Sequence, residues 1–127
     1  MELRPHIKKA IVNEDSSPEE SFQNTVIRQV IKMKHDLLIA HTHQNIRKKR
    51  KDFSAIGREN QLKFLNSLFE KDQTFKSELR GMIIGHFNVD EYQVYSEISN
   101  AANRRILNII KERMIDHLSV LVDEKSV

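Results

Sequence analysis

Six histidines are the residues in this chain best suited to holding a metal ion or moving a proton. Helices that bind metals usually place two ligands one turn apart, as in His-x-x-x-His or Glu-x-x-His pairs. Neither pattern occurs here: His35 and His41 are not one turn apart, and His41 and His43 project from different sides of a helix. We therefore expect no metal ion and no cofactor.

The acidic and hydroxyl side chains form no recognisable catalytic pattern. Asp36, Glu97, Glu112 and Asp116 fall mostly on the outer faces of their predicted helices, where carboxylates stay solvated. The chain has no nucleophile elbow, no phosphate-binding glycine loop, no dinucleotide-binding fingerprint and no cysteine. These absences predict a protein that is not an enzyme and has no catalytic residue.

A run of five basic residues could bind a polyanion such as RNA or DNA. It comprises Arg47, Lys48, Lys49, Arg50 and Lys51, in a chain whose net charge is only +3. Cations at a helix C-terminus also complement the helix dipole, so a purely structural role is the competing interpretation. No aromatic residue is interleaved with the run, which favours contacts with phosphates over stacking on bases.

The helix expected to carry these residues begins at a strong start signal. Ser17, Pro18 and Glu20 supply an N-cap hydroxyl, a proline at the first helical position and a glutamate three residues past the cap. No glycine or proline then occurs up to Lys51, which predicts one continuous helix over about 18–52. Its inner face would comprise Phe22, Val26, Val30, Met33, Leu37 and Ala40, widened by Ile27, Ile31 and Leu38.

Further helices are expected along the rest of the chain. After a break at 53–57, helices are expected over about 58–71 and 73–85, the second of them capped by Asp72. They precede a second long helix over about 89–122, which starts at a capping box formed by Asn88 and Glu91. The inner stripe of the second long helix would be Tyr95, Ile98, Ala102, Ile106, Ile110, Met114, Leu118 and Leu121.

These elements predict an all-α fold. Residues 1–16 are expected to form an N-terminal arm and loop, with a short helix over 3–12. The whole chain, residues 1–127, would be a single helical domain in which the two long helices pack with the two shorter ones as an irregular bundle.

Polar residues interrupt the predicted inner faces of both long helices. Gln23, Lys34 and His41 fall near the middle of the first face, and Asn103 and Arg113 fall on the second. Burying such groups is costly unless they are paired. They could line a ligand pocket between the long helices, take part in an interface between copies of the chain, or be paired or snorkel to water in an ordinary core. The wide apolar arc of the first helix also fits a helix covered by neighbours on two sides, as in a dimer.

Several motifs resemble those of an uncharacterised family of short all-helical bacterial proteins, some of which carry the label "glyoxalase". The resemblance spans about residues 20–121. It lies in Phe22-Gln23-Asn24-Thr25 with Arg28 and Lys32, in Asp36-Leu37-Leu38, in Gly81-Met82-Ile83-Ile84-Gly85-His86-Phe87, in Glu91-Tyr92 with Tyr95, and in Asn103-Arg104-Arg105. This resemblance implies a helical fold and no particular chemistry. Metal-dependent glyoxalases resemble a strand-rich fold with His and Glu ligands, so we do not expect that activity here.

The function predicted from the sequence is that of a non-enzymatic helical protein–protein interaction module, as a homo-oligomer such as a dimer or as a subunit of a larger assembly. One alternative is a nucleic-acid or ribonucleoprotein-associated factor that uses residues 47–51, and a second is a small-ligand binder between the long helices. The N-terminus has no apolar signal core, and no apolar run approaches the roughly 20 residues that span a bilayer. A cytoplasmic protein without a membrane partner is therefore expected.

Overall fold

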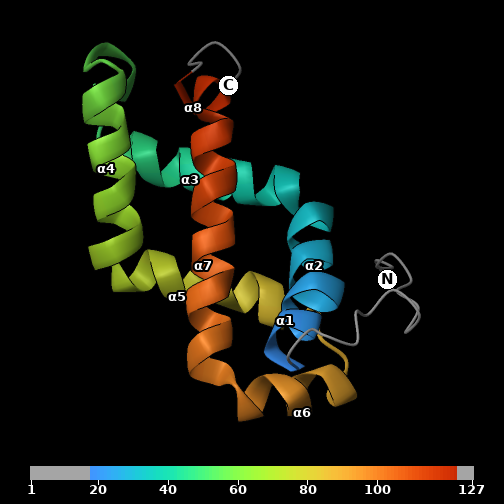
Figure 1. Cartoon of the computed structure of the whole chain (residues 1–127). Helices are drawn as coiled ribbons and strands as arrows, with labels where there is room; N and C mark the ends of the chain where they lie inside the picture. Colours follow the sequence, from blue (N-terminus) through green and yellow to red (C-terminus); the bar gives the residue numbers. More distant parts are fainter. Residues whose placement is uncertain (1–17, 123–127) are drawn as a thin grey trace.

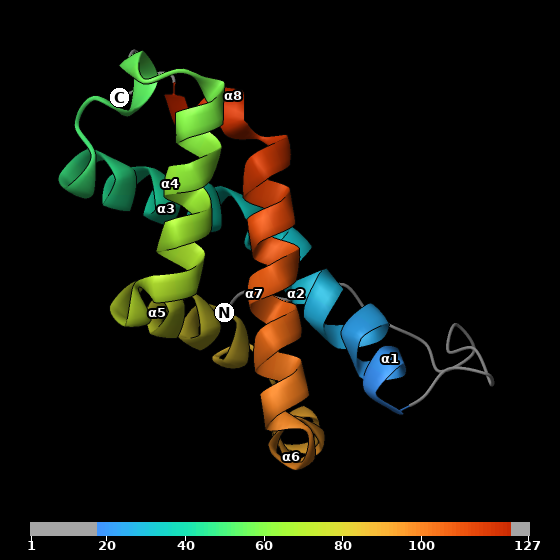
Figure 2. The ribbon, with the colours of Figure 1, turned by 60° about the vertical axis from the view of Figure 1, so that its left-hand side comes forward.

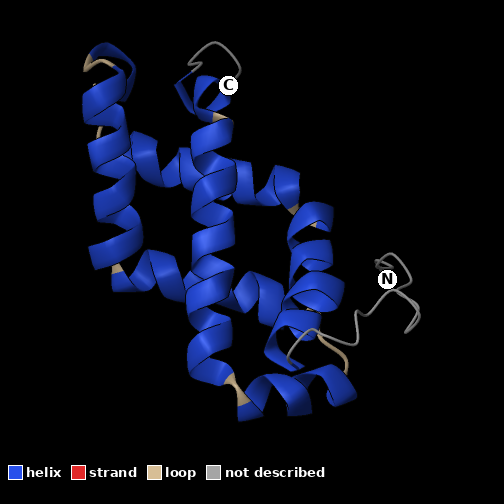
Figure 3. Cartoon of the chain, in the orientation of Figure 1, coloured by secondary structure: helices blue, strands red, loops and turns tan. Residues whose placement is uncertain are grey.

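Helices form almost all of the chain that the structure describes. The computed structural model describes residues 18–122, and within that range it contains helices joined by short loops and no strand (Figure 3). The prediction of an all-α helical bundle is confirmed. The predicted arm and loop over 1–16, with its helix over 3–12, and the predicted cap Ser17 lie outside the described residues.

The bundle is arranged around α7, which runs through its middle (Figure 1). Helix α4 lies beside α7 and runs in the opposite direction, while α3 and α5 cross α7 (Figures 1 and 2). Helix α6 closes one end of the bundle next to α1, and α8 lies at the other end. The helices are α1 (Pro18–Phe22), η2 (Gln23–Ile27), α2 (Arg28–Met33), α3 (His35–Lys49), η3 (Phe53–Ala55), α4 (Arg58–Lys71), α5 (Gln73–Ile84), α6 (Val89–Glu97), α7 (Ser99–Asp116) and α8 (Leu118–Val122).

The inner stripe predicted for the C-terminal part of the chain forms the centre of the core. Of the predicted positions, all but half-buried Ile98 are buried, and Ile106, Ile110 and Met114 on α7 are fully enclosed. Fully burying a side chain of this kind stabilises the fold by about 1.5–3 kcal/mol relative to leaving it in water. The periodicity of the sequence therefore identified the face of α7 around which the other helices pack.

The first predicted long helix is wrong as a continuous element, because it breaks at Lys34. The Lys34 backbone leaves the helical conformation, at φ −96° and ψ 12°. Helix α3 therefore runs in a different direction from α2 (Figure 1). The break shifts the inner face: Leu37 and Ala40 are exposed, whereas Leu38, Thr42, Asn45 and Ile46 are buried. Both η2, before the break, and α3, after it, pack against α7, and α2 and α3 run in different directions (Figure 1). This packing explains a break at which the sequence has no glycine or proline.

The second predicted long helix is interrupted as well, at Ile98 and at His117. Both backbones leave the helical region, at φ −125° and ψ 27° for Ile98 and φ −111° and ψ 28° for His117. The bend at Ile98 lets the Tyr95 hydroxyl donate a hydrogen bond to Asn103 Oδ1 at 2.6 Å. In a straight helix these residues would be separated by about 12 Å along the axis. This bond and the buried Tyr95 ring favour the bend.

The chain also contains a π-helical turn, η2, directly after α1. The Thr25 hydroxyl donates to the Ser21 carbonyl at 2.7 Å, and the Arg28 N–H bonds the Gln23 carbonyl five residues back. A hydroxyl that bonds a carbonyl one turn earlier competes with the backbone ladder and widens the turn. Thr25 thus provides a local cause for the π-turn, which contains Gln23.

Candidate functional site

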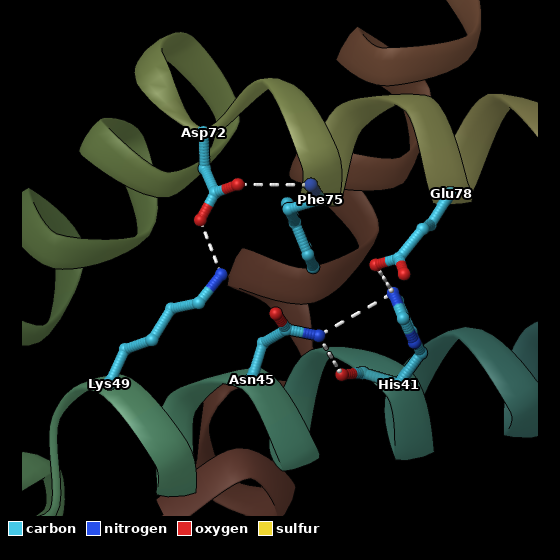
Figure 4. A network of polar contacts seen from close by, with 6 residues as sticks. All are labelled: His41, Asn45, Lys49, Asp72, Phe75 and Glu78. Carbon is cyan, nitrogen blue, oxygen red and sulfur yellow. Dashed lines mark hydrogen bonds and ion pairs between the residues drawn. The ribbon is translucent and has the colours of Figure 1, made fainter.

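The α3–α5 interface contains the best-defined polar network in the described part of the chain (Figure 4). His41 of α3 stacks flat on Phe75 of α5, with ring centroids 5.7 Å apart and ring planes within 2° of parallel. His41 Nε2 lies 3.1 Å from Glu78 Oε1. Asn45, one turn further along α3, donates from Nδ2 to the His41 carbonyl oxygen at 2.9 Å. The imidazole is therefore held on one face by a ring and at one edge by a carboxylate.

Hydrogen-bond chemistry decides where the His41 proton lies. An ionised carboxylate can only accept, so the contact with Glu78 requires a proton on His41 Nε2. The Asn45 amide nitrogen lies 3.4 Å from the same Nε2, but it is itself a donor. It donates its hydrogen bond to the His41 backbone carbonyl instead. Next to this pair the Thr42 hydroxyl is buried and has no hydrogen-bond partner among the described residues. The arrangement orients a histidine and holds a proton, but it presents no activated nucleophile.

A second contact joins the same two helices at the end of α3. Lys49 pairs with Asp72, which also caps α5 by accepting the Phe75 backbone N–H at 3.0 Å (Figure 4). The hydrogen bond from Lys49, and then that from Phe75, hold the pKa of Asp72 below its ordinary value of 3.8. Because the folded-state pKa is depressed, the stabilisation is present at neutral pH and is lost as the pH falls through that lowered pKa. Asp72 is half-buried but its partner Lys49 is exposed, so screening by solvent keeps the effect small.

An open groove of about 570 Å³ lies at this same corner, where α4 turns into α5. Lys49 and Asp72 form part of its wall, so the ion pair closes one side of it. The groove is not the pocket between the long helices that the sequence suggested, because it lies at the α3–α4–α5 corner. Its lining residues are Lys49, Phe64, Ser67, Leu68, Lys71, Asp72, Gln73 and Thr74.

The five basic residues lie at the end of α3 and in the turn that follows. All five, Arg47, Lys48, Lys49, Arg50 and Lys51, are exposed. Lys49 pairs with Asp72, and Arg50 Nε lies 2.8 Å from Asp52 Oδ1. Within residues 20–122, no acidic side chain pairs with the other three. The predicted helix C-terminus is confirmed only up to Lys49, and the last two basic residues belong to the turn.

The five polar residues predicted on inner faces do not form one pocket. Asn103 bonds Tyr95, Arg113 bonds His35, and His41 belongs to the α3–α5 network. Gln23 lies half-buried in the π-turn, and Lys34 lies half-buried at the helix break. The structure thus distributes these residues among separate places, and Asn103, Arg113 and His41 each have a partner within the chain.

The Arg113–His35 contact connects α7 to the first residue of α3. Arg113 Nη1 lies 3.1 Å from His35 Nδ1. Burial, with the charges of His117 and Arg113, lowers the pKa of His35 from 6.5, and Asp36 opposes that shift. A histidine with a lowered folded-state pKa binds protons less readily than in the unfolded chain. Its contribution to stability is therefore lost as the pH falls from about 6.5 through the lowered folded-state pKa.

The partners of these side chains were missed at the level of sequence. Glu78 contacts His41 and His35 contacts Arg113, in each case from another helix. Tyr95 was predicted as a core residue, but its bond to Asn103 forms across the break at Ile98. Asp72 was expected as a helix cap, and nothing in its spacing indicated that Lys49, 23 residues earlier, would reach it. Only the position of one helix against another could identify these pairs.

Neither known proteins nor general types of site assign a function to the chain. No family model matches the chain, and no curated protein or solved structure matches it either. The resemblance to an uncharacterised helical family accordingly stays a prediction. Among the described residues, no group of three or more His, Cys, Asp and Glu side chains could hold a metal ion, and no helix is long and apolar enough to cross a membrane.

Proposed function

We propose that this protein is a non-enzymatic helical interaction module that binds a second copy of itself through the outer face of α6. The observation that supports this most directly is the exposure of two apolar side chains on the first turn of that helix. Val89 is 73% exposed and Tyr92 is 52% exposed. They lie three residues apart, so they project from the same side of α6.

The Tyr92 ring is well placed to form the centre of such an interface. It packs on buried Tyr95, with ring centroids 5.8 Å apart, and Tyr95 in turn packs on Phe87. An aromatic ring held by neighbours loses little conformational entropy on binding, and tyrosine is enriched at interface centres. A two-fold axis would pair this face with itself, because isologous interfaces use the same patch on both subunits.

Self-association was predicted from the apolar arc of the first long helix, and a different surface supports it now. The wide apolar arc predicted for one continuous helix is split at Lys34, and Val30, Ile31 and Leu38 are all fully buried within the chain. The arc therefore no longer requires a partner, and the proposal rests on α6.

Light scattering of the purified chain at tens of micromolar tests self-association. We expect the wild type to have a mass above the 14.9 kDa of one chain. The double variant Val89→Ser with Tyr92→Ser should have the mass of a single chain. Leu37→Ser, which changes an exposed apolar residue on α3, is the matched control and should leave the assembly intact. A wild type that stays monomeric, or a double variant that assembles as the wild type does, would exclude this interface.

The second candidate function is binding of a polyanion such as RNA or DNA by the basic run. It is favoured because Arg47, Lys48 and Lys51 are exposed and have no acidic partner within the described range. Cations left unpaired at a helix end can neutralise phosphates without reading sequence. The small-ligand alternative has weaker support, since the polar residues that would line its pocket are distributed among separate places.

Replacing Arg47, Lys48 and Lys51 by glutamine tests the second candidate. If each cation contacts a phosphate, the slope of log affinity against log salt should flatten by about 0.7–0.9 for every contact removed. Affinity for single-stranded RNA and for duplex DNA is measured by fluorescence anisotropy across a salt series. The triple variant Arg28→Gln, Lys32→Gln and Arg104→Gln removes the same charge from exposed positions on α2 and α7 and serves as control. Equal slopes for the two variants would argue against a site at residues 47–51.

A further inference from the structure

Three nitrogen-bearing side chains meet where α3 begins and α7 ends. Arg113 Nη1 lies 3.1 Å from His35 Nδ1, and the His35 and His117 ring centroids are 4.5 Å apart. His117 Nδ1 lies 2.9 Å from the Arg113 carbonyl oxygen. All three residues are half-buried, so their outer edges reach solvent. This group is separate from the outer face of α6.

The donor and acceptor properties of these groups assign their protons. A guanidinium can only donate, so His35 Nδ1 accepts from Arg113 and the His35 proton lies on Nε2. A carbonyl oxygen can only accept, so His117 Nδ1 donates to it. The donors left over are the His35 Nε2–H and the remaining guanidinium N–H groups. Protonation of His117 Nε2 would add another donor.

The group carries positive charge that no carboxylate of the described residues neutralises directly. Arg113 is charged at every physiological pH, and within residues 20–122 no acidic side chain forms an ion pair with it. Asp36 acts on His35 only through space, and its influence is smaller than those of burial, His117 and Arg113. Without an anion, protonating His35 would place an imidazolium against a guanidinium.

We propose that Arg113, His35 and His117 form a binding site for a small oxyanion, either a phosphate or a carboxylate group. The guanidinium N–H groups that His35 does not use can match two oxygens of such a group, and the His35 and His117 rings add positive charge beside it when they are protonated. A bound anion favours the charged form of each imidazole, so binding takes up protons and becomes tighter as the pH falls. The site thus links anion occupancy to the joint between α3, α7 and α8.

The test is a pH titration of the histidine ring resonances of the full chain by NMR. Spectra are recorded with sodium phosphate, with sodium acetate and with sodium chloride at matched ionic strength. Phosphate or acetate is expected to raise the pKa of His35 by about one unit relative to chloride and to shift the His117 ring resonances as well. The ring resonances of His86, on the α5–α6 connection, are the internal control and should be the same in all three salts at any one pH.

The two anions distinguish the sources of the oxyanion. A shift with phosphate alone assigns the site to phosphate groups, and a shift with both salts assigns it to oxyanions in general, including protein carboxylates. Titrations that superimpose in all three salts overturn the proposal.

Variants of Arg113 tie the effect to this site. Arg113→Gln should abolish the shift, whereas Arg113→Lys keeps a charge without the planar fork and should retain a reduced shift. Arg104→Gln removes a charge from an exposed position on the same helix and should behave as the wild type. Far-UV circular dichroism checks that each variant is folded. A full phosphate shift in folded Arg113→Gln contradicts the proposal.

Discussion

Replacing Phe75 by alanine is expected to lower the free energy of unfolding by about 3–5 kcal/mol, the usual cost of removing a buried aromatic ring. The Phe75 side chain is fully buried, packs edge-on against Phe69 at 5.1 Å between centroids, and forms the surface on which His41 stacks. The substitution leaves the Phe75 backbone N–H free to bond Asp72, so the helix cap survives. The loss therefore reports packing between α3, α4 and α5.

Urea denaturation followed by circular dichroism measures this loss. Small domains are stable by only about 5–15 kcal/mol, so the alanine variant could leave too little stability to analyse. Phe75→Leu keeps most of the volume and should give a smaller loss of the same sign. Val120→Ala, at a position on α8 that is 46% exposed, is the control and should stay within about 0.5 kcal/mol of the wild type. Equal stability of Phe75→Ala and the wild type would mean that this corner is not packed as described.

Replacing Gly57 by alanine should destabilise the protein by about 1–3 kcal/mol, although there is room for the added methyl group. Gly57 has φ +81° and ψ 158°, a conformation that only glycine adopts readily, and a Cβ there would meet no heavy atom within 4 Å. Its carbonyl accepts the Gln61 N–H at 3.0 Å, so this backbone conformation starts α4. The expected loss is therefore one of backbone strain alone.

Gly81 provides the matched comparison. It lies inside α5, where a Cβ also meets nothing within 4 Å and the backbone has no positive φ. Alanine is favoured over glycine in a helix interior, so Gly81→Ala should stabilise the protein by about 0.5–1 kcal/mol. Thermal unfolding of both variants should show shifts of opposite sign in the midpoint. Shifts of the same sign would contradict the conformation assigned to Gly57.

Local signals in the sequence determined several elements on their own. Asp72 caps α5, and the Asn88–Glu91 capping box opens α6, because each uses a side chain within one turn of the backbone group that it satisfies. The start of α4 at Arg58 and its end at Lys71 match the prediction. The buried stripe of α7 could also be predicted, because a repeat of three to four residues allows only one inner face.

The tertiary structure alone decided where the long helices bend. Lys34, Ile98 and His117 are ordinary helix residues, and they leave the helical conformation because neighbouring segments must follow different directions over one core. The bend at Lys34 turned Leu37 outward and brought Thr42 inward, a change of face that no local pattern shows.

The candidate sites depend on the same bends and crossings. His41 meets Glu78 and Arg113 meets His35 because α3 lies alongside α5 and contacts α7, which brings together residues far apart in the sequence. The sequence by itself determined a helical chain with an identifiable core face, polar residues near that face and a basic run. Which polar side chains meet was decided only in three dimensions, because hydrogen bonds require contact over a few ångströms and sequence spacing specifies contacts only within a turn or two of one helix.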